Sequence, residues 1–427
     1  MPKRASSPQI SHFNAPFLST LNSASKNNIK DDPNYYALDS KSLVSTSTIH
    51  KFETGTGSSI YLSLAPLLES TSEELILVTL WIKKLGLPDP SDLPGLDVNV
   101  KSIFLLPFSV MHPKFIIVDR RTVVLPSCNI SWEEWFEGCI TFSGPSVGQF
   151  VRFYSQFWER REMPPPDALA FDEVENARWK DATPTSLAAE EHANRTTRFL
   201  TSAHGSEITN IPTVFLPSPH RRTPHVQPFA TTDNVVAPPT PLNVFVLTLL
   251  SKAEKSIQIQ TPNLTSPPIL SAILKALSRG IDIRILTSEK LMVLEQLVTA
   301  GTTTKRCIRK LVKRYNNLSR TTSSCLASDE EAAIGLPPLG RLHISYFTPL
   351  GGPKKRGQEN GEPQQSHLKM MIVDDEVLVL GSGNLDRASW FTSQELGVAF
   401  FDQALVERVR RIVHDAMIGR VRVVFDS

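Results

Sequence analysis

The feature that most constrains the fold of this chain is a stretch of 18 residues that occurs twice. The first copy runs from His112 to Asn129 and the second from His367 to Asn384. In both, a lysine follows the histidine by two, an aspartate follows the lysine by five, and the asparagine follows the histidine by seventeen. A lone His, Lys or Asn is a weak signal, whereas a repeat that keeps every offset indicates a duplicated structural unit.

Each copy has the pattern of a β-hairpin. Apolar runs at 115–118 and 123–125, and again at 370–373 and 377–380, predict pairs of strands. Side chains two apart on a strand share a face, so the His and Lys of each copy point the same way. The returning strand brings a Ser and the Asn to the same end. An imidazole, an ammonium, a hydroxyl and an amide gathered in this way suit a phosphate group.

The sequence resembles the phospholipase D superfamily, whose signature is HxK, four residues, Asp, six residues, then GSxN. The second copy matches at every position, while the first has Pro126 in place of the glycine. The resemblance implies these catalytic-motif residues: His112, Lys114, Asp119, His367, Lys369 and Asp374. The phosphate-binding residues that it implies are Ser127, Asn129, Ser382 and Asn384. No metal and no cofactor is implied.

The resemblance also implies a mechanism, in which one histidine attacks phosphorus and the other protonates the leaving alcohol. We assign His112 as nucleophile and His367 as general acid/base, although the sequence itself does not order the two. A coupled pair of this kind predicts a bell-shaped pH profile. The two Asp residues lie at expected turns, so we treat them as supporting. Glu137 and Glu395 either orient a histidine ring or merely begin a strand; we favour orientation.

The predicted fold class is α/β, with two phospholipase D-like modules packed face to face around one shared site, each a mixed sheet flanked by helices. The predicted organisation is a disordered tail at 1–45, a first module at 46–160, a Pro-rich linker at 161–240 and a second module at 241–427. The linker includes one short predicted helix, 187–194.

The first module is predicted to be shortened. The second module shows helices at 242–253 and 269–278 and strands at 256–260 and 281–286. The elements predicted before the first motif are a helix at 60–68 and strands at 75–81 and 97–104. Between the strand at 75–81 and the first motif only the strand at 97–104 is predicted, whereas the corresponding interval of the second module is expected to contain a helix and two strands. One helix and one strand are therefore missing from the first module, which raises the question of how firmly His112 is held.

Composition limits the function classes. The formal net charge of +2 makes no global case for binding nucleic acid or an anionic membrane. No apolar run approaches the roughly 20 residues that span a bilayer, so a lipid substrate would be met peripherally. We expect a monomer, because both motifs lie in one chain, with no obligatory nucleic acid. The expected location is cytoplasmic with peripheral membrane association; the Ser/Asn-rich amino terminus leaves a mitochondrial transit peptide as the alternative.

Several further residues and segments are assigned from the sequence. The cysteines lack metal-ligand spacing and are expected to be free thiols: Cys128, Cys139, Cys307 and Cys325. Four histidines are expected to be packed or solvated: His50, His192, His204 and His343. The basic run 305–314 suits either a solvated helix face or an anionic membrane surface. Residues 351–365 are expected to form a mobile loop near the site.

The predicted function is phospholipid hydrolysis or phosphatidyl transfer, with a nuclease or a non-catalytic binding protein as alternatives.

Overall fold

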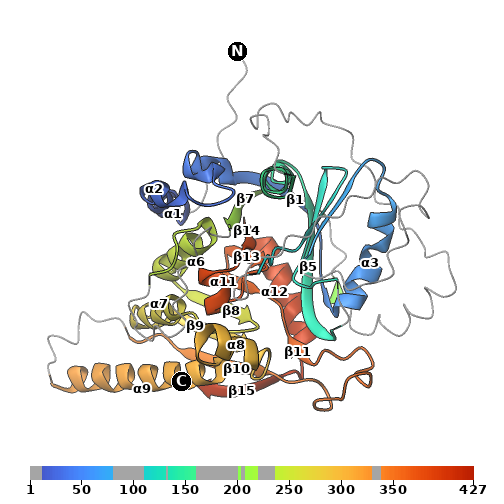
Figure 1. Ribbon diagram of the computed structural model, residues 1–427. Coiled ribbons are helices and arrows are strands. Elements are labelled where there is room, and N and C mark those ends of the chain that lie inside the picture. The colour runs from blue at the N-terminus through green and yellow to red at the C-terminus, as the bar shows by residue number, and fades with distance from the viewer. Residues whose placement is uncertain are drawn as a thin grey trace.

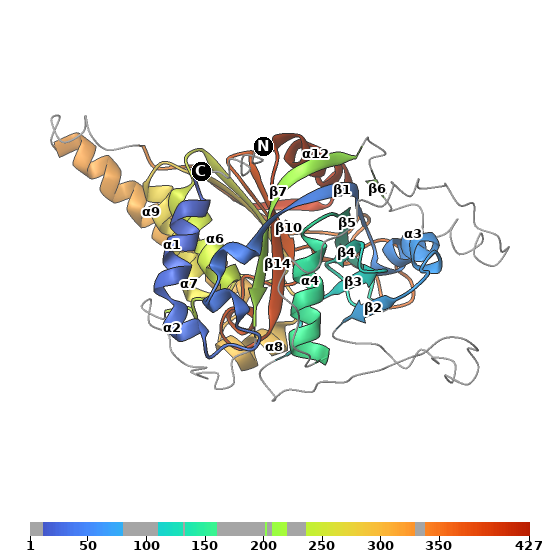
Figure 2. The ribbon, with the colours of Figure 1, turned by 90° about the horizontal axis from the view of Figure 1, so that it is seen from above.

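The computed structural model describes residues 12–79, 110–130, 133–159, 201–202, 207–219, 236–328 and 338–427. Its centre is one mixed β-sheet with helices on both sides (Figure 1, Figure 2). The strands follow the order β15-β10-β9-β8-β12-β13-β14-β7-β1-β5-β4-β3-β2. The predicted mixed α/β class with flanking helices is therefore confirmed. All strands on this path belong to one continuous sheet, and the packing of two separate modules face to face stays a prediction.

The element bounds are as follows. The strands are β1 Val44–Gly55, β2 Leu75–Val78, β3 Phe115–Val118, β4 Thr122–Pro126, β5 Trp135–Ser143, β6 Thr201–Ser202, β7 Ile208–Ser218, β8 Ser256–Thr261, β9 Asp282–Thr287, β10 Leu342–Phe347, β11 Gln365–Ser366, β12 Met370–Val373, β13 Val377–Gly381, β14 Glu395–Phe401 and β15 Val421–Asp426. The helices are α1 Asn14–Ser23, α2 Ser25–Asn28, α3 Gly57–Glu69, α4 Val147–Tyr154, α6 Pro241–Lys252, α7 Pro267–Ser278, α8 Val293–Ala300, α9 Thr304–Ser328, α11 Arg387–Phe391 and α12 Gln403–Met417.

Both motif copies form the predicted hairpins. Strands β3 and β4 pair antiparallel in the first copy, as β12 and β13 do in the second. Each hairpin is flanked by a third antiparallel strand, β5 in the first half and β14 in the second. A helix followed by a strand precedes each of them, α3–β2 and α6–β8. The repeat in the sequence is thus a repeat of strand order.

The two equivalent helices begin in the same way. Thr56 caps α3, its hydroxyl oxygen accepting a hydrogen bond from Ser59 N at 3.4 Å. Thr240 caps α6 by accepting from Asn243 N at 3.4 Å, and Pro241 follows it at the first helical position, where no amide hydrogen is needed. The expected helix 242–253 and strand 256–260 are confirmed to within a residue or two.

The amino-terminal segment differs from the expected disordered tail from residue 12 onward. Phe13, Phe17 and Leu21 are buried, and the Phe17 ring lies edge-on to Phe245 of α6 with centroids 5.1 Å apart. Their spacing of four residues is typical of one face of a helix, but the many Ser and Asn residues around them favoured a disordered segment instead. Residues 12–45 therefore belong to the folded body, and residues 1–11 lie outside the described part.

The expected linker at 161–240 contains a strand near the middle of the sheet. Strand β7 pairs with β1 through 208–214 and with β14 through 213–218. The sequence did not predict this strand because it contains Pro212 and Pro217. Proline has no backbone N–H to donate to a neighbouring strand, so it normally indicates the end of a strand. Each proline lies where β7 is paired on one side only, so neither amide is required by a second neighbour.

The two halves differ at the outer edges of the sheet. Strand β2 ends the described sheet order on that side, whereas β8 in the second half continues into parallel β9 and β10. The predicted strand 97–104 and the predicted helix 187–194 lie outside the described residues. Among the helices of the described ranges, none combines the length and apolar character needed to cross a membrane.

Candidate active site

The two motif copies meet because the chain ahead of each histidine pairs with the other half of the sheet. Met111 forms a parallel bridge with Gln394, and β11 pairs parallel with the start of β5. The His112 amide donates to the Gln394 carbonyl at 3.0 Å, and the His367 amide donates to the Phe136 carbonyl at 2.8 Å. Each histidine backbone is therefore fixed by the strand that follows the other hairpin.

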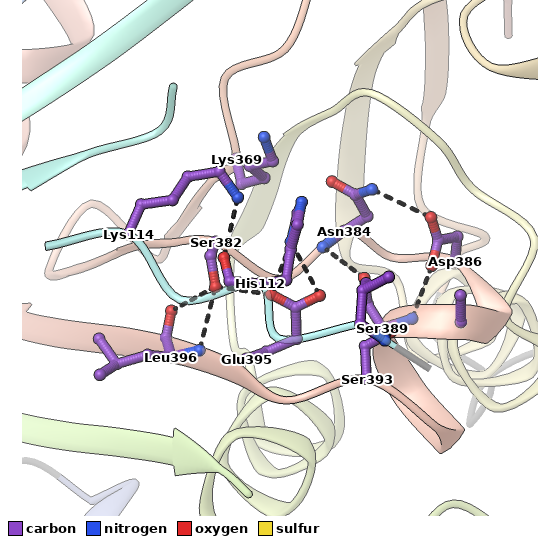
Figure 3. Close-up of polar contacts among 12 residues, drawn as sticks. His112, Lys114, Lys369, Ser382, Asn384, Asp386, Ser389, Ser393, Glu395 and Leu396 are labelled. Carbon is purple, nitrogen blue, oxygen red and sulfur yellow. Dashed lines mark hydrogen bonds and ion pairs between the residues drawn. The ribbon is translucent and has the colours of Figure 1, made fainter. Parts of the chain in front are cut away.

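The side chains are crossed in the same way. His112 Nδ1 lies 2.9 Å from Glu395 Oε2, and His367 Nδ1 lies 2.7 Å from Glu137 Oε1. Figure 3 shows the His112 ring standing over the Glu395 carboxylate. All four side chains are buried. The two glutamates are thus placed where the expected orienting role requires them, but each serves the histidine of the other half.

The two serines stand behind the glutamates. Ser382 Oγ donates to Glu395 at 2.6 Å and accepts from Leu396 N at 3.1 Å. Ser127 Oγ donates in the same way to Glu137 and accepts from the amide that follows that glutamate, at 2.9 Å. The expected phosphate-binding role is not what this geometry shows, because each hydroxyl proton is committed to a carboxylate. The serines fix the glutamates, which in turn hold the histidines.

Both lysines are buried in the same cluster (Figure 3). Lys114 Nζ donates to the His112 carbonyl at 2.8 Å. Lys369 Nζ donates to the Ser127 carbonyl of the first copy at 3.2 Å and lies 2.9 Å from both ring nitrogens of His367. Burial lowers the pKa of Lys369 to about 8. Burial, followed by repulsion from Lys369, lowers the pKa of Lys114 to about 7. The cluster therefore favours an anion that would keep both ammonium groups charged.

Burial also keeps both imidazoles neutral. It lowers the pKa of His367 to about 3, an effect that the Glu137 carboxylate opposes and Lys369 reinforces. Burial lowers the pKa of His112 as well, against the attraction of Glu395. A neutral imidazole retains the lone pair that a nucleophile needs.

The signature asparagines have one polar atom each to spare. Asn384 Nδ2 donates to Asp386 Oδ2 at 3.0 Å, while its Oδ1 is buried without a hydrogen-bond partner. Asn129 Oδ1 is likewise buried, and neither oxygen has a partner among the described residues. Sequence reasoning missed Asp386, whose other oxygen caps α11 by accepting from Ser389 N at 2.8 Å. Its position two residues after the signature Asn was the only available signal.

The two signature aspartates do not join the cluster. Asp374 accepts from the amides of Glu254, Lys255 and Ser256 at 2.7–3.0 Å. Asp119 does the same for the amides of residues 72–74 at the start of β2. Both have positive φ, 53° and 49°, in the hairpin turns, a conformation that Asp tolerates better than most residues. They tie each hairpin to the neighbouring strand, in agreement with the supporting role.

Two departures from expectation bear on the site. The Trp135 ring lies against His367 with centroids 4.8 Å apart, a wall that the motif did not predict. Pro126, where the signature has glycine, leaves the turn unchanged, because Ser127 N still donates to the Gly138 carbonyl at 2.8 Å. The corresponding bond from Ser382 N to the Leu396 carbonyl is 2.9 Å long.

The remaining candidates lie elsewhere or outside the described residues. His50 bonds to Glu207 and Ser143, and His343 to Asp426 and Ser345, all away from the cluster. Three cysteines are free and buried, as expected: Cys128, Cys139 and Cys307. His192 and His204 fall outside the described ranges.

Residues 246–417 match a family model described as the cardiolipin synthase, phospholipase D-like domain. This segment includes the whole second motif and Glu395, while the first motif lies ahead of it. No curated protein sequence matches the chain significantly.

Three solved structures resemble the chain at low identity. Phosphatidylserine synthase from Haemophilus influenzae is 15% identical, with a TM-score of 0.41 over 74% of this chain and 64% of its own length. Nuc from Salmonella typhimurium, described as a phospholipase D family member, is 18% identical, with a TM-score of 0.27 over 43% of this chain and 90% of its own. NucT from Helicobacter pylori is 16% identical, with a TM-score of 0.27 over 42% and 88%. Likenesses of this strength assign no activity to the chain. The likeness of this chain to the cardiolipin synthase, phospholipase D-like domain therefore rests on residues 246–417.

Proposed function

We propose that this protein cleaves phosphodiesters through a phosphohistidine formed on His112. The observation that carries the proposal is the crossed pair of histidine–glutamate contacts, which completes a site from both motif copies. Glu395 engages Nδ1 of His112, and no hydrogen bond to Nε2 is found within the described residues. The His367 ring, in contrast, is in contact with Lys369. This difference supports His112 as the nucleophile.

The reaction would proceed in two displacements. His112 Nε2 attacks phosphorus and forms a P–N bond, while the P–O bond to the leaving alcohol breaks and protonated His367 gives that oxygen its proton. A water or a second alcohol then attacks phosphorus. Neutral His367 takes the proton of the attacking group, and the P–N bond breaks to return His112.

The proposed proton donor must first be charged. Since burial keeps the pKa of His367 at about 3 in the free protein, an anionic substrate has to raise it. The same phosphodiester would keep Lys114 and Lys369 protonated, and the two ammonium groups would neutralise its non-bridging oxygens. Binding of the substrate would thus set the charge state that the chemistry needs.

We propose glycerophospholipids as the substrate class, with either hydrolysis or phosphatidyl transfer to an alcohol. The support is the family model, whose description names cardiolipin synthase. Nucleic acid is the rival substrate, since the superfamily site design serves several phosphodiesters.

The test is headgroup release and alcohol transfer from mixed phospholipid vesicles with added ethanol, with single-stranded DNA as a parallel substrate. We expect phosphatidylethanol from the unmodified protein and none from His112→Ala or His367→Ala. His343→Ala, a histidine outside the cluster, is the matched control and should retain activity. DNA cleavage without lipid turnover would show that nucleic acid, rather than phospholipid, is the substrate class. If folded protein turned over neither substrate, the enzymatic proposal would be refuted.

A further inference from the structure

The helix α8 exposes an apolar face. Val293, Leu294, Leu297 and Val298 are 37%, 76%, 39% and 50% exposed. Their spacing places them on one side of the helix, where they form a contiguous group. A contiguous group of exposed apolar side chains is a candidate surface for binding a membrane or another protein.

The helix that carries this face lies beside the active site. Helix α8 packs on α11, which is capped by Asp386. The pKa of Glu295 on α8 is raised to about 7. Desolvation is the main cause, and the negative charges of Asp386 and Glu395 add to it. Val110, two residues before His112, is also 39% exposed, and its carbonyl accepts from Gln394 N at 2.9 Å. Exposed apolar side chains therefore occur on two segments that lie near Glu395.

The next helix adds positive charge. Residues 301–328 contain no Asp or Glu. One face of α9 is buried and apolar, and includes Ile308 and Leu311. Away from this buried face, α9 has five exposed cationic residues: Arg306, Arg309, Lys310, Lys313 and Arg320. Figure 1 shows α9 following α8 and running out from the body of the molecule.

The two helices are joined rigidly at their junction. The Gln296 side chain of α8 is buried, and its Oε1 accepts from both the amide and the hydroxyl of Thr304, at 2.6 Å and 2.9 Å. Thr304 is the first residue of α9. The start of α9 is thus fixed relative to α8.

We propose that the exposed faces of α8 and α9 dock the protein on an anionic phospholipid membrane. The inference rests on the proposed function in one respect: docking would bring the site to an amphiphilic substrate. Apolar side chains of α8 would enter the acyl boundary, and the cations of α9 would contact anionic headgroups. Both features are needed to choose this occupant, because cations alone would suit nucleic acid equally well.

Other occupants fit less well. The α8 face offers only Leu and Val, with no aromatic ring on which a nucleotide base could stack. A second copy of the chain, related by a two-fold axis across this surface, would bring two sets of α9 cations together, which costs free energy.

The test is flotation of the full-length protein with vesicles of phosphatidylcholine and phosphatidylserine, compared with phosphatidylcholine alone. We expect binding to the anionic vesicles only. The triple variant Arg306→Gln/Lys310→Gln/Lys313→Gln should bind about 100-fold more weakly, at about a factor of five for each cation. The double variant Leu294→Asn/Val298→Asn should lose about tenfold, since it removes the most exposed part of the apolar face. Leu62→Asn and Lys252→Gln/Lys275→Gln alter exposed residues on other helices and should bind as the unmodified protein does.

A second readout separates docking from catalysis. Both docking variants should turn over a soluble phosphodiester as the unmodified protein does, while their turnover of vesicle lipid falls. Vesicle binding without any phosphodiester cleavage would support docking and refute the proposed function. Equal binding by the variants and the unmodified protein would overturn the docking proposal. So would a preference for single-stranded DNA, or a dimer that the α8 variant dissociates without weakening vesicle binding.

Discussion

The aspartate of the second motif should be needed for stability rather than for chemistry, and Asp374→Asn tests this. Asparagine tolerates the positive φ of 53° at this position, so the change isolates the charge and one acceptor oxygen. Oδ1 of the buried carboxylate accepts from the amides of Lys255 and Ser256, and Oδ2 from that of Glu254.

The expected loss follows from these three bonds. Hydrogen bonds to a charged group contribute about 1.5–3 kcal/mol each and neutral ones about 1 kcal/mol. The amide oxygen can retain the two bonds at Oδ1 in weakened form, while the third is lost. We therefore expect the free energy of unfolding to fall by about 3 kcal/mol, measured by urea denaturation.

The matched control is Asp375→Asn in the same turn. Asp375 also has positive φ, at 61°, and pairs with Arg410 at an exposed position. We expect a change under about 1 kcal/mol for this surface pair. Turnover per folded molecule in the ethanol-transfer assay should be unchanged in both variants. An Asp374→Asn protein of undiminished stability that had lost turnover would refute the structural assignment.

Three further changes test the site. Lys114→Met should flatten the pH dependence of stability: above the folded pKa of about 7 and below the unfolded value of about 10.4, the unfolded state binds more protons, so the unfolding free energy of the unmodified protein rises with pH there. Denaturation at pH 7 and pH 9 measures this slope, and an equal slope in the variant would contradict it. Glu137→Gln, which alters the partner of the second imidazole, should reduce transfer about 10–100-fold, whereas Glu133→Gln should not. Gly381→Ala places a methyl carbon 2.3 Å from a backbone carbonyl oxygen and should cost about 1–3 kcal/mol in thermal unfolding. Gly383→Ala has the end of the Leu242 side chain as its nearest contact, at 3.1 Å, and should cost less.

The hairpins could be predicted from sequence because their apolar runs are short, intense and bounded by turn residues. The strand β7 could not, since two prolines interrupt it and its half-paired geometry appears only when both neighbours are in place. The Ser-rich β1 was missed for a related reason: its neighbours, rather than its composition, make it a strand.

The site was predictable at the level of residue type and less so at the level of contact. The repeat named both histidines and both lysines, and the structure places all four in one buried cluster. The partners of the histidines lie 283 and 230 residues away, so no local pattern could assign them. The serines show the same limit, because residue identity gives a hydroxyl its donor capacity but the strand register decides where it points.

The crossed histidine–glutamate contacts have a consequence for biogenesis. During synthesis the first half leaves the ribosome with His112 but without Glu395, and its own carboxylate has no ring to hold until the second hairpin arrives. A chain that ends before the second hairpin therefore has His112 and Glu137 but lacks the partner of each. Both histidine–glutamate contacts can therefore form only after the second hairpin and β14 have been synthesised.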